Sequence, residues 1–132
     1  MAYLLDTNIC IYIIKKKPVS VLERFTLIPP TEIGISMITV AELEYGAKKS
    51  AFPEKNVEAL HQFLTPFNLF DFDYRASVEY GIIRTELEMK GTLIGSLDML
   101  IAAHAKSINC ILVTNNEREF NRVTGLQVEN WV

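Results

Sequence analysis

Several carboxylate side chains lie beside apolar stretches of the sequence, where burial of an ionised group costs free energy. Asp6 ends the apolar run YLLD, and Asp98 opens the apolar stretch DMLIAAHA. Glu42 and Glu119 lie in ITVAELEYG and ILVTNNEREF. Clustered carboxylates repel one another and take up protons unless a cation balances them. No lysine or arginine precedes Lys106 in the stretch after Asp98, so an internal ion pair is not obvious there.

A hard divalent cation would resolve this repulsion. Mg²⁺ and Mn²⁺ prefer oxygen ligands, keep several of their waters and are commonly held by a few Asp and Glu side chains. Such an ion lowers the pKa of a bound water and stabilises charge on a phosphate. The chain has no C-x-x-C metal spacing. These residue types therefore indicate phosphodiester or phosphoryl chemistry more than peptide hydrolysis.

Each acid also has an ordinary structural interpretation. Asp6 could cap the helix that follows it. Thr39 and Glu42 have the spacing of a capping box, which is the favoured interpretation of Glu42 taken alone. Asp98 could face the dipole of its own helix from the first turn. Glu119 could be a solvated charge, so the acids indicate a metal site only as a set.

Alternating strands and helices must position these acids. Short strands are expected at 3–5, 33–36, 69–72, 110–113 and 126–128, and residues 8–14 are apolar in a helical or extended way. Helices or helical turns are expected at 19–27, 39–49, 54–64, 74–90, 97–107 and 117–120. This alternation predicts an α/β sandwich with a mainly parallel central sheet. In such sheets ligands bind beyond the carboxyl ends of the strands, where polar and acidic residues collect in this sequence.

Composition bounds the class of protein. The chain has 132 residues, of which 49% are hydrophobic and 22% charged, so we expect a single globular domain over residues 1–132. It has no apolar run as long as a membrane span and no recognisable signal peptide, so we expect a cytoplasmic protein without membrane association. Cys10 and Cys110 lie in apolar contexts and are expected to be buried and reduced.

The net charge of −3 argues against nucleic acid as a partner. Setting aside the four acids of a metal site leaves the remaining acids nearly balanced by the 13 lysines and arginines. Several basic residues could then contact phosphates, although any one of them could equally be a solvated helix end. They are Lys15, Lys16, Lys17, Lys48, Lys49, Arg84 and Lys90. His104 lies off the face of Asp98 and is expected to pack in the core, and His61 is expected to have no role.

Four motifs occur in one order along the chain: LLDTN, ITVAELEYG, IGSLDMLIAAHA and ILVTNNEREF, followed by a terminal L-x-x-E-x-W. Together they resemble the PIN-domain ribonucleases, in particular the VapC toxins of bacterial toxin–antitoxin pairs, over essentially the whole chain. The resemblance implies a three-layer α/β/α domain with a short, mainly parallel central sheet flanked by helices. It implies a site around Mg²⁺ or Mn²⁺ whose residues are the acids Asp6, Glu42, Asp98 and Glu119, supported by Thr7, Asn8 and Thr114.

The sequence departs from the family pattern at two places. Many relatives carry T-x-D where Thr114 is followed by Asn115 and Asn116. We therefore expect Glu119 to supply the fourth charge, while Asn116 could still bind water or metal through its carbonyl. Ser96 and Leu97 stand before Asp98 where relatives often have proline and an aromatic residue, which should affect packing more than chemistry.

The resemblance also implies an activity and its partners. The activity is Mg²⁺-dependent hydrolysis of RNA, with transfer RNA or another structured RNA as target, which inhibits translation and growth. The main partner is a VapB antitoxin, in a complex that holds a homodimer of the toxin, and this chain itself is expected to bind no specific DNA. Candidate walls for the antitoxin groove are Ile9, Ile13, Ile14, Leu43 and Ala47, although core packing explains them equally well.

Other classes of protein fit less well. A haloacid-dehalogenase-like phosphatase needs a second aspartate two positions after Asp6, where this chain has Asn8. A response-regulator receiver needs paired acids after the first strand and a lysine near the last strand. A catalytically weak PIN-like domain that binds antitoxin or RNA stays open as the alternative.

Overall fold

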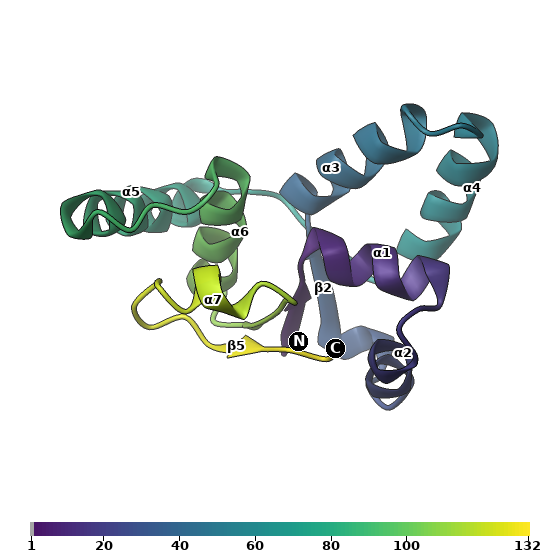
Figure 1. Ribbon diagram of the computed structural model, residues 1–132, viewed down its shortest axis with the longest axis horizontal. Helices are drawn as coiled ribbons and strands as arrows, with labels where there is room; N and C mark the ends of the chain where they lie inside the picture. Colours follow the sequence, from purple (N-terminus) through teal and green to yellow (C-terminus); the bar gives the residue numbers. More distant parts are fainter. Residues whose placement is uncertain (1) are drawn as a thin grey trace.

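A five-stranded parallel sheet forms the middle of the molecule, with helices on both faces (Figure 1). This computed structural model describes residues 2–132. The strands, in the sheet order β3-β2-β1-β4-β5, are β1 (Tyr3–Leu5), β2 (Ile33–Ser36), β3 (Asn68–Phe70), β4 (Ile111–Val113) and β5 (Val128–Glu129). The helices are α1 (Thr7–Lys15), α2 (Val19–Thr26), α3 (Met37–Lys48), α4 (Pro53–Leu64), α5 (Tyr74–Lys90), α6 (Ser96–Ser107) and α7 (Glu117–Phe120), with a 3₁₀ turn, η1 (Pro30–Glu32). The predicted α/β/α layering with a parallel sheet is confirmed.

The two faces of the sheet bury separate apolar clusters. Neighbouring residues of β1 point to opposite faces, so Leu5 packs with side chains of α1 to α4 while Leu4 packs with side chains of α5 and α6. Both leucines are fully buried. A sheet covered on both faces has continuous apolar strands, as in the sequences YLL and ILV.

The carboxyl ends of the three middle strands meet at one edge of the sheet. Leu5 pairs in register with Val113 of β4, and the Asp6 amide donates to the Val113 carbonyl at 3.0 Å. Ser36 ends β2 on the other side of β1. The strand order reverses at β1, and such a switch point is where α/β sheets form their sites.

Most element boundaries agree with the sequence, but the capping box predicted at Thr39 and Glu42 is wrong. Helix α3 begins at Met37, because the Ser36 hydroxyl accepts a hydrogen bond from the Ile38 amide at 3.1 Å and caps the helix. Thr39 therefore lies buried inside the helix and Glu42 lies beyond its first turn. The 8–14 segment is helical. The last strand was expected at 126–128, but it lies at Val128–Glu129 and pairs there with β4.

Two smaller predictions concern the cysteines and the membrane. Cys10 and Cys110 are buried and form no disulfide, as expected. None of the helices in the described part of the chain has both the length and the apolar character that crossing a membrane requires.

Candidate active site

Asp6 occupies the centre of the carboxyl edge. Its Oδ1 accepts a hydrogen bond from the Ile9 amide at 2.9 Å, so it caps α1, and its Oδ2 accepts one from the Thr114 hydroxyl. Asp6 is 5% exposed and Thr114 is fully buried. The capping interpretation of Asp6 is thus confirmed, and it is compatible with metal binding because each carboxylate oxygen has a second lone pair.

Ionisation of Asp6 costs free energy because its carboxyl is buried. Burial raises the pKa of its carboxyl to about 6, and the hydrogen bonds from Thr114 and Ile9 act in the opposite direction. The carboxylates of Asp98 and Glu42 raise the pKa further by repulsion. Residues from three separate segments of the sequence therefore act electrostatically on one another at this edge.

Glu42 is held by the first turn of α1. Thr7 donates its hydroxyl proton to Oε1 of Glu42 at 2.7 Å, in a partly buried contact between residues 35 positions apart. Asn8, the next residue, is exposed. The predicted supporting residue Thr7 thus touches a predicted acid, whereas the structure places Asn8 at the surface beside it.

Asp98 lies in the first turn of α6. This position is the one required if Asp98 faces the positive end of the helix dipole. Burial raises the pKa of this half-buried carboxyl, and Glu119 and Glu42 raise it further by repulsion. Glu119 lies on the short helix α7 and is partly exposed. The structure therefore brings Asp98 close to Glu42 and Glu119, and also to Asp6.

Among residues 2–132, no lysine, arginine or histidine side chain forms an ion pair with these four acids. The ion pairs found among the described side chains involve other acids: Glu44, Glu79, Glu88 and Glu129. Within residues 2–132 no three acid, histidine or cysteine side chains converge tightly enough to form a ready-made metal cage. An all-oxygen donor set of this kind nevertheless fits Mg²⁺ or Mn²⁺, because Mg²⁺ is usually held by one or two carboxylates and several waters.

The comparisons with known proteins decide the family. The family described as "PIN domain" matches residues 3–126. The chain belongs to the PIN-domain family. It is 47% identical to "Ribonuclease VapC2" of Haemophilus influenzae strain Rd over 132 residues, covering 100% of this chain and 99% of that protein. It is also 47% identical over 131 residues, 99% of this chain and 98% of that protein, to "tRNA(fMet)-specific endonuclease VapC" of Shigella flexneri.

A solved structure agrees with this assignment. The chain superposes with a TM-score of 0.93 and 46% identity, over 100% of both chains, on the "crystal structure of VapBC2 from Rickettsia felis bound to a DNA fragment from their promoter". This PIN domain therefore falls among the VapC ribonucleases, and the resemblance noted from its motifs is confirmed.

Two polar residues of this PIN domain follow β4. The Thr114 hydroxyl donates to Asp6 and at the same time accepts a hydrogen bond from the Asn116 amide at 2.9 Å. The hydrogen bond from the Asn116 amide closes a turn that leads directly into α7, which carries Glu119. The Asn116 side chain, which stands where relatives have aspartate, makes no capping bond to α7.

Most of the predicted basic residues lie at helix ends, whereas Arg84 lies within α5. Lys15 closes α1, Lys16 and Lys17 follow it, and all three are exposed. Lys48 and Lys49 are exposed at the end of α3, where Lys48 pairs with Glu44 at 3.4 Å. The Lys49 ammonium lies 4.7 Å from the ring centroid of Tyr45, an aromatic residue that the sequence reasoning did not select.

A groove of about 320 Å³ runs between α1, α3 and α4. Of the candidate walls for an antitoxin groove, Ile14, Leu43 and Ala47 line this groove, and so does Glu42. Ile9 and Ile13 are buried in the core, which is the alternative that was left open for them. A larger hollow of about 610 Å³ lies along α4 and is lined by none of the four acids.

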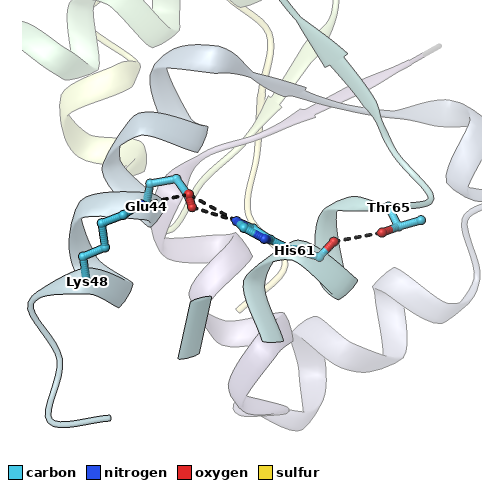
Figure 2. A network of polar contacts seen from close by, with 4 residues as sticks. All are labelled: Glu44, Lys48, His61 and Thr65. Carbon is cyan, nitrogen blue, oxygen red and sulfur yellow. Dashed lines mark hydrogen bonds and ion pairs between the residues drawn. The ribbon is translucent and has the colours of Figure 1, made fainter. Parts of the chain in front are cut away.

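The helices α3 and α4 are also joined by a network of polar contacts at the surface (Figure 2). Nε2 of His61 lies 2.9 Å from Oε1 of Glu44, and the Thr65 hydroxyl donates to the His61 carbonyl at 2.8 Å. His61 lowers the pKa of Glu44, with a smaller effect in the same direction from Lys48. His61 was expected to have no role, and the structure shows that it links two helices.

Proposed function

We propose that this chain is a Mg²⁺- or Mn²⁺-dependent endoribonuclease toxin of a VapBC-type module. The observation that carries the proposal is the set of mutually repelling carboxylates at the switch point of the sheet, none of which forms an ion pair with a side chain in the described part of the chain. The ribonuclease names of relatives that match the whole chain support the same class of reaction.

Four acids would hold the ion: Asp6, Glu42, Asp98 and Glu119. When bound, the ion would acidify a water and stabilise negative charge on the phosphate. The chain itself would orient its acids, because the Thr114 hydroxyl and the Ile9 amide favour the ionised form of Asp6 and Thr7 fixes Glu42. A carboxylate beside the ion would accept a proton from the attacking water.

A structured RNA such as transfer RNA is the substrate that we propose. The Shigella flexneri relative is named for transfer RNA, and unpaired loops offer accessible backbone and unstacked bases. The lysines at the ends of α1 and α3 would contact phosphates, and Tyr45 is 66% exposed and could stack on a base. Cleavage of such an RNA would inhibit translation and growth.

A VapB antitoxin is the partner that we propose for the groove between α1, α3 and α4. The groove offers apolar side chains for an amphipathic peptide, and Glu42 beside them would attract a basic side chain at the active site. A solved neighbour is a VapBC complex on promoter DNA, and we expect the antitoxin rather than this chain to contact such DNA.

A homodimer is expected within that complex. Helix α5 extends to one side of the molecule, where it packs chiefly on α6 (Figure 1). Along it, Tyr74, Val78, Ile82 and Met89 are exposed by 82%, 47%, 48% and 83%, which is an apolar stripe that a second copy could cover.

The test is incubation of the antitoxin-free protein with total cellular RNA in Mg²⁺ or in EDTA, beside Asp98→Ala. We expect discrete fragments with Mg²⁺ that are absent with EDTA and absent for the variant. A restricted set of fragments that maps to transfer RNA would identify the target. Intact RNA under all conditions would favour the alternative, a PIN-like domain that only binds antitoxin or RNA.

A further inference from the structure

A buried polar contact links the two halves of the molecule. Oγ of Ser36 and Nδ1 of His104 lie 2.7 Å apart, and the two residues are 0% and 1% exposed. Ser36 ends β2 and caps α3, while His104 lies within α6. The contact therefore spans 68 positions of sequence and joins helices of opposite layers.

The contact is compatible with a neutral imidazole in either tautomer. Ser36 Oγ accepts the Ile38 amide and keeps its own proton and a second lone pair, so it can donate to Nδ1 of His104 or accept from it. Burial lowers the pKa of His104, although Asp73 and Asp71 act weakly against it, so the neutral form is favoured.

The contact joins the two segments of the chain that carry two of the acids of the site. Glu42 follows Ser36 by six positions on α3, and Asp98 precedes His104 by six positions on α6. Across positions 2–132 no other side-chain hydrogen bond joins α6 to β2 or α3. The ring of Phe72 packs edge-on against His104 at 5.5 Å between centroids, which restricts the orientation of the imidazole.

Glu42 on α3 and Asp98 on α6 carry like charges that act on each other. Repulsion from Glu42 is one of the causes that raise the pKa of Asp98. Apolar packing between α3 and α6 opposes separation, but it is not directional and fixes no register. A buried hydrogen bond is directional and breaks at a cost, since it leaves unsatisfied polar atoms behind.

We propose that Ser36 and His104 are positioning residues, which set the spacing of Glu42 and Asp98 and thereby the affinity of the acidic site for its divalent cation. This inference rests on the proposed function, because it concerns the same metal site. It assigns a positioning role to two buried residues that are not among the four acids.

The test measures Mn²⁺ affinity of the RNA-free protein by electron paramagnetic resonance. We expect His104→Leu to weaken binding by about tenfold, the low end of what outer residues contribute at metal sites. His104→Asn places an amide near the position of Nδ1 and should stay within about twofold of wild type. Cleavage by His104→Leu should recover at saturating Mn²⁺, because the reacting groups are intact.

A matched control separates positioning from loss of stability. Ile83 on α5 is 1% exposed in the same apolar cluster as α6, and Ile83→Ala should lower the melting temperature while leaving Mn²⁺ affinity unchanged. Ser36→Ala should weaken Mn²⁺ binding as His104→Leu does, and the double variant should be no weaker than either. Should His104→Leu fail to fold, Ser36→Ala and His104→Asn carry the comparison.

Two outcomes would overturn different claims. Mn²⁺ affinity in folded His104→Leu or Ser36→Ala that equals wild type, or that falls only as far as in Ile83→Ala, would remove the positioning role and leave the metal site standing. Absence of Mn²⁺ binding by the wild-type protein would remove the proposed metal site and this inference with it.

Discussion

Thr114 donates a buried hydrogen bond to the carboxylate of Asp6 across 108 positions of sequence. The two residues follow adjacent parallel strands, β4 and β1, which Leu5 and Val113 hold in register. Thr114 thus favours the ionised form of an acid that burial and its neighbours push toward the neutral form. Because a metal-binding carboxylate must be ionised, this hydroxyl would favour metal binding at the proposed site through its effect on Asp6.

Removal of this hydroxyl should make Asp6 harder to ionise. The pKa of Asp6, about 6 in the metal-free protein, should rise in Thr114→Val, because the lost hydrogen bond favours the charged form. Carbon-13 NMR titration of the Asp6 carboxyl measures this directly. Thr114→Ser keeps the hydroxyl and is the matched control. An unchanged Asp6 pKa in Thr114→Val would contradict the role assigned to this contact.

Asp6→Asn should abolish cleavage and stabilise the metal-free protein at neutral pH. The folded-state pKa of Asp6 is about 6 against an ordinary 3.8, so the free energy of unfolding falls between about pH 4 and pH 6 as the unfolded chain loses its proton first. The shift corresponds to about 3 kcal/mol at most. Asparagine keeps the cap to Ile9 and carries no charge.

Urea unfolding without metal, at pH 4 and at pH 8, tests this linkage. Asp6→Asn should be more stable than wild type by about 1–3 kcal/mol at pH 8 and equal to it near pH 4. Antitoxin binding should be largely retained. If Asp6→Asn and wild type were equally stable at both pH values, burial of the Asp6 charge would not cost free energy. If the variant cleaved RNA and were toxic like wild type, the mechanism would be wrong.

Divalent metal should stabilise the wild-type protein by binding the folded state. Mg²⁺ or Mn²⁺ at 100 times its Kd adds about 2.7 kcal/mol to the free energy of unfolding. Asp98→Asn should lose most of this gain, because its carboxylate lies close to those of Glu42 and Glu119. Glu58→Gln removes an exposed acid elsewhere on α4 and should keep the gain. Differential scanning calorimetry with and without EDTA measures it, and a gain retained in Asp98→Asn would exclude Asp98 as a ligand.

Much of the fold could be predicted from local sequence signals. The helix 74–90 was delimited by its pattern and by Gly91, which takes φ +66° as a left-handed C-cap, and both of its ends are confirmed. The start of α3 was misplaced, because Ser36 and Thr39 are both good caps and only the pairing of β2 with β1 and β3 decides which one ends the strand.

The site could be predicted only in part, for a physical reason. The four acids lie within motifs and have apolar neighbours in the sequence, so they could be selected as candidates from the sequence alone. The contacts that orient them join residues far apart, such as Thr7 with Glu42 and Ser36 with His104. Serine, threonine and histidine are common in cores and at caps, so nothing local distinguishes these partners before the sheet is assembled.

Thr39 offers a test of the buried polar region between α3 and α6. Its hydroxyl is fully buried and has no hydrogen-bond partner among the residues that the structure describes. Thr39→Val should stabilise the protein by about 1 kcal/mol, because it removes an unsatisfied polar atom at nearly constant volume. Thr39→Ser keeps the hydroxyl, loses a methyl group and should destabilise by about 1 kcal/mol. Thermal unfolding measures both, and a less stable Thr39→Val would show that the hydroxyl has a partner.

The groove that we propose for the antitoxin can be blocked without changing any of the four acids. Ala59 lies exposed on the α4 wall of the groove, so Ala59→Arg should fold normally and fill the space that the antitoxin peptide needs. We expect its affinity for VapB to fall by about tenfold or more, since a long charged side chain replaces a methyl group in an apolar groove. Titration calorimetry with the cognate antitoxin measures the loss, and RNA cleavage by the free variant should match wild type.

Gln62→Arg adds the same charge to α4, at an exposed position in the other hollow along this helix, and is the matched control. It should bind antitoxin as wild type does, because its side chain does not line the groove. Equal loss of affinity in both variants would point to a general effect of charge. Unchanged affinity in Ala59→Arg would move the antitoxin to another surface, because a peptide seated between α1, α3 and α4 cannot share that space with an arginine side chain.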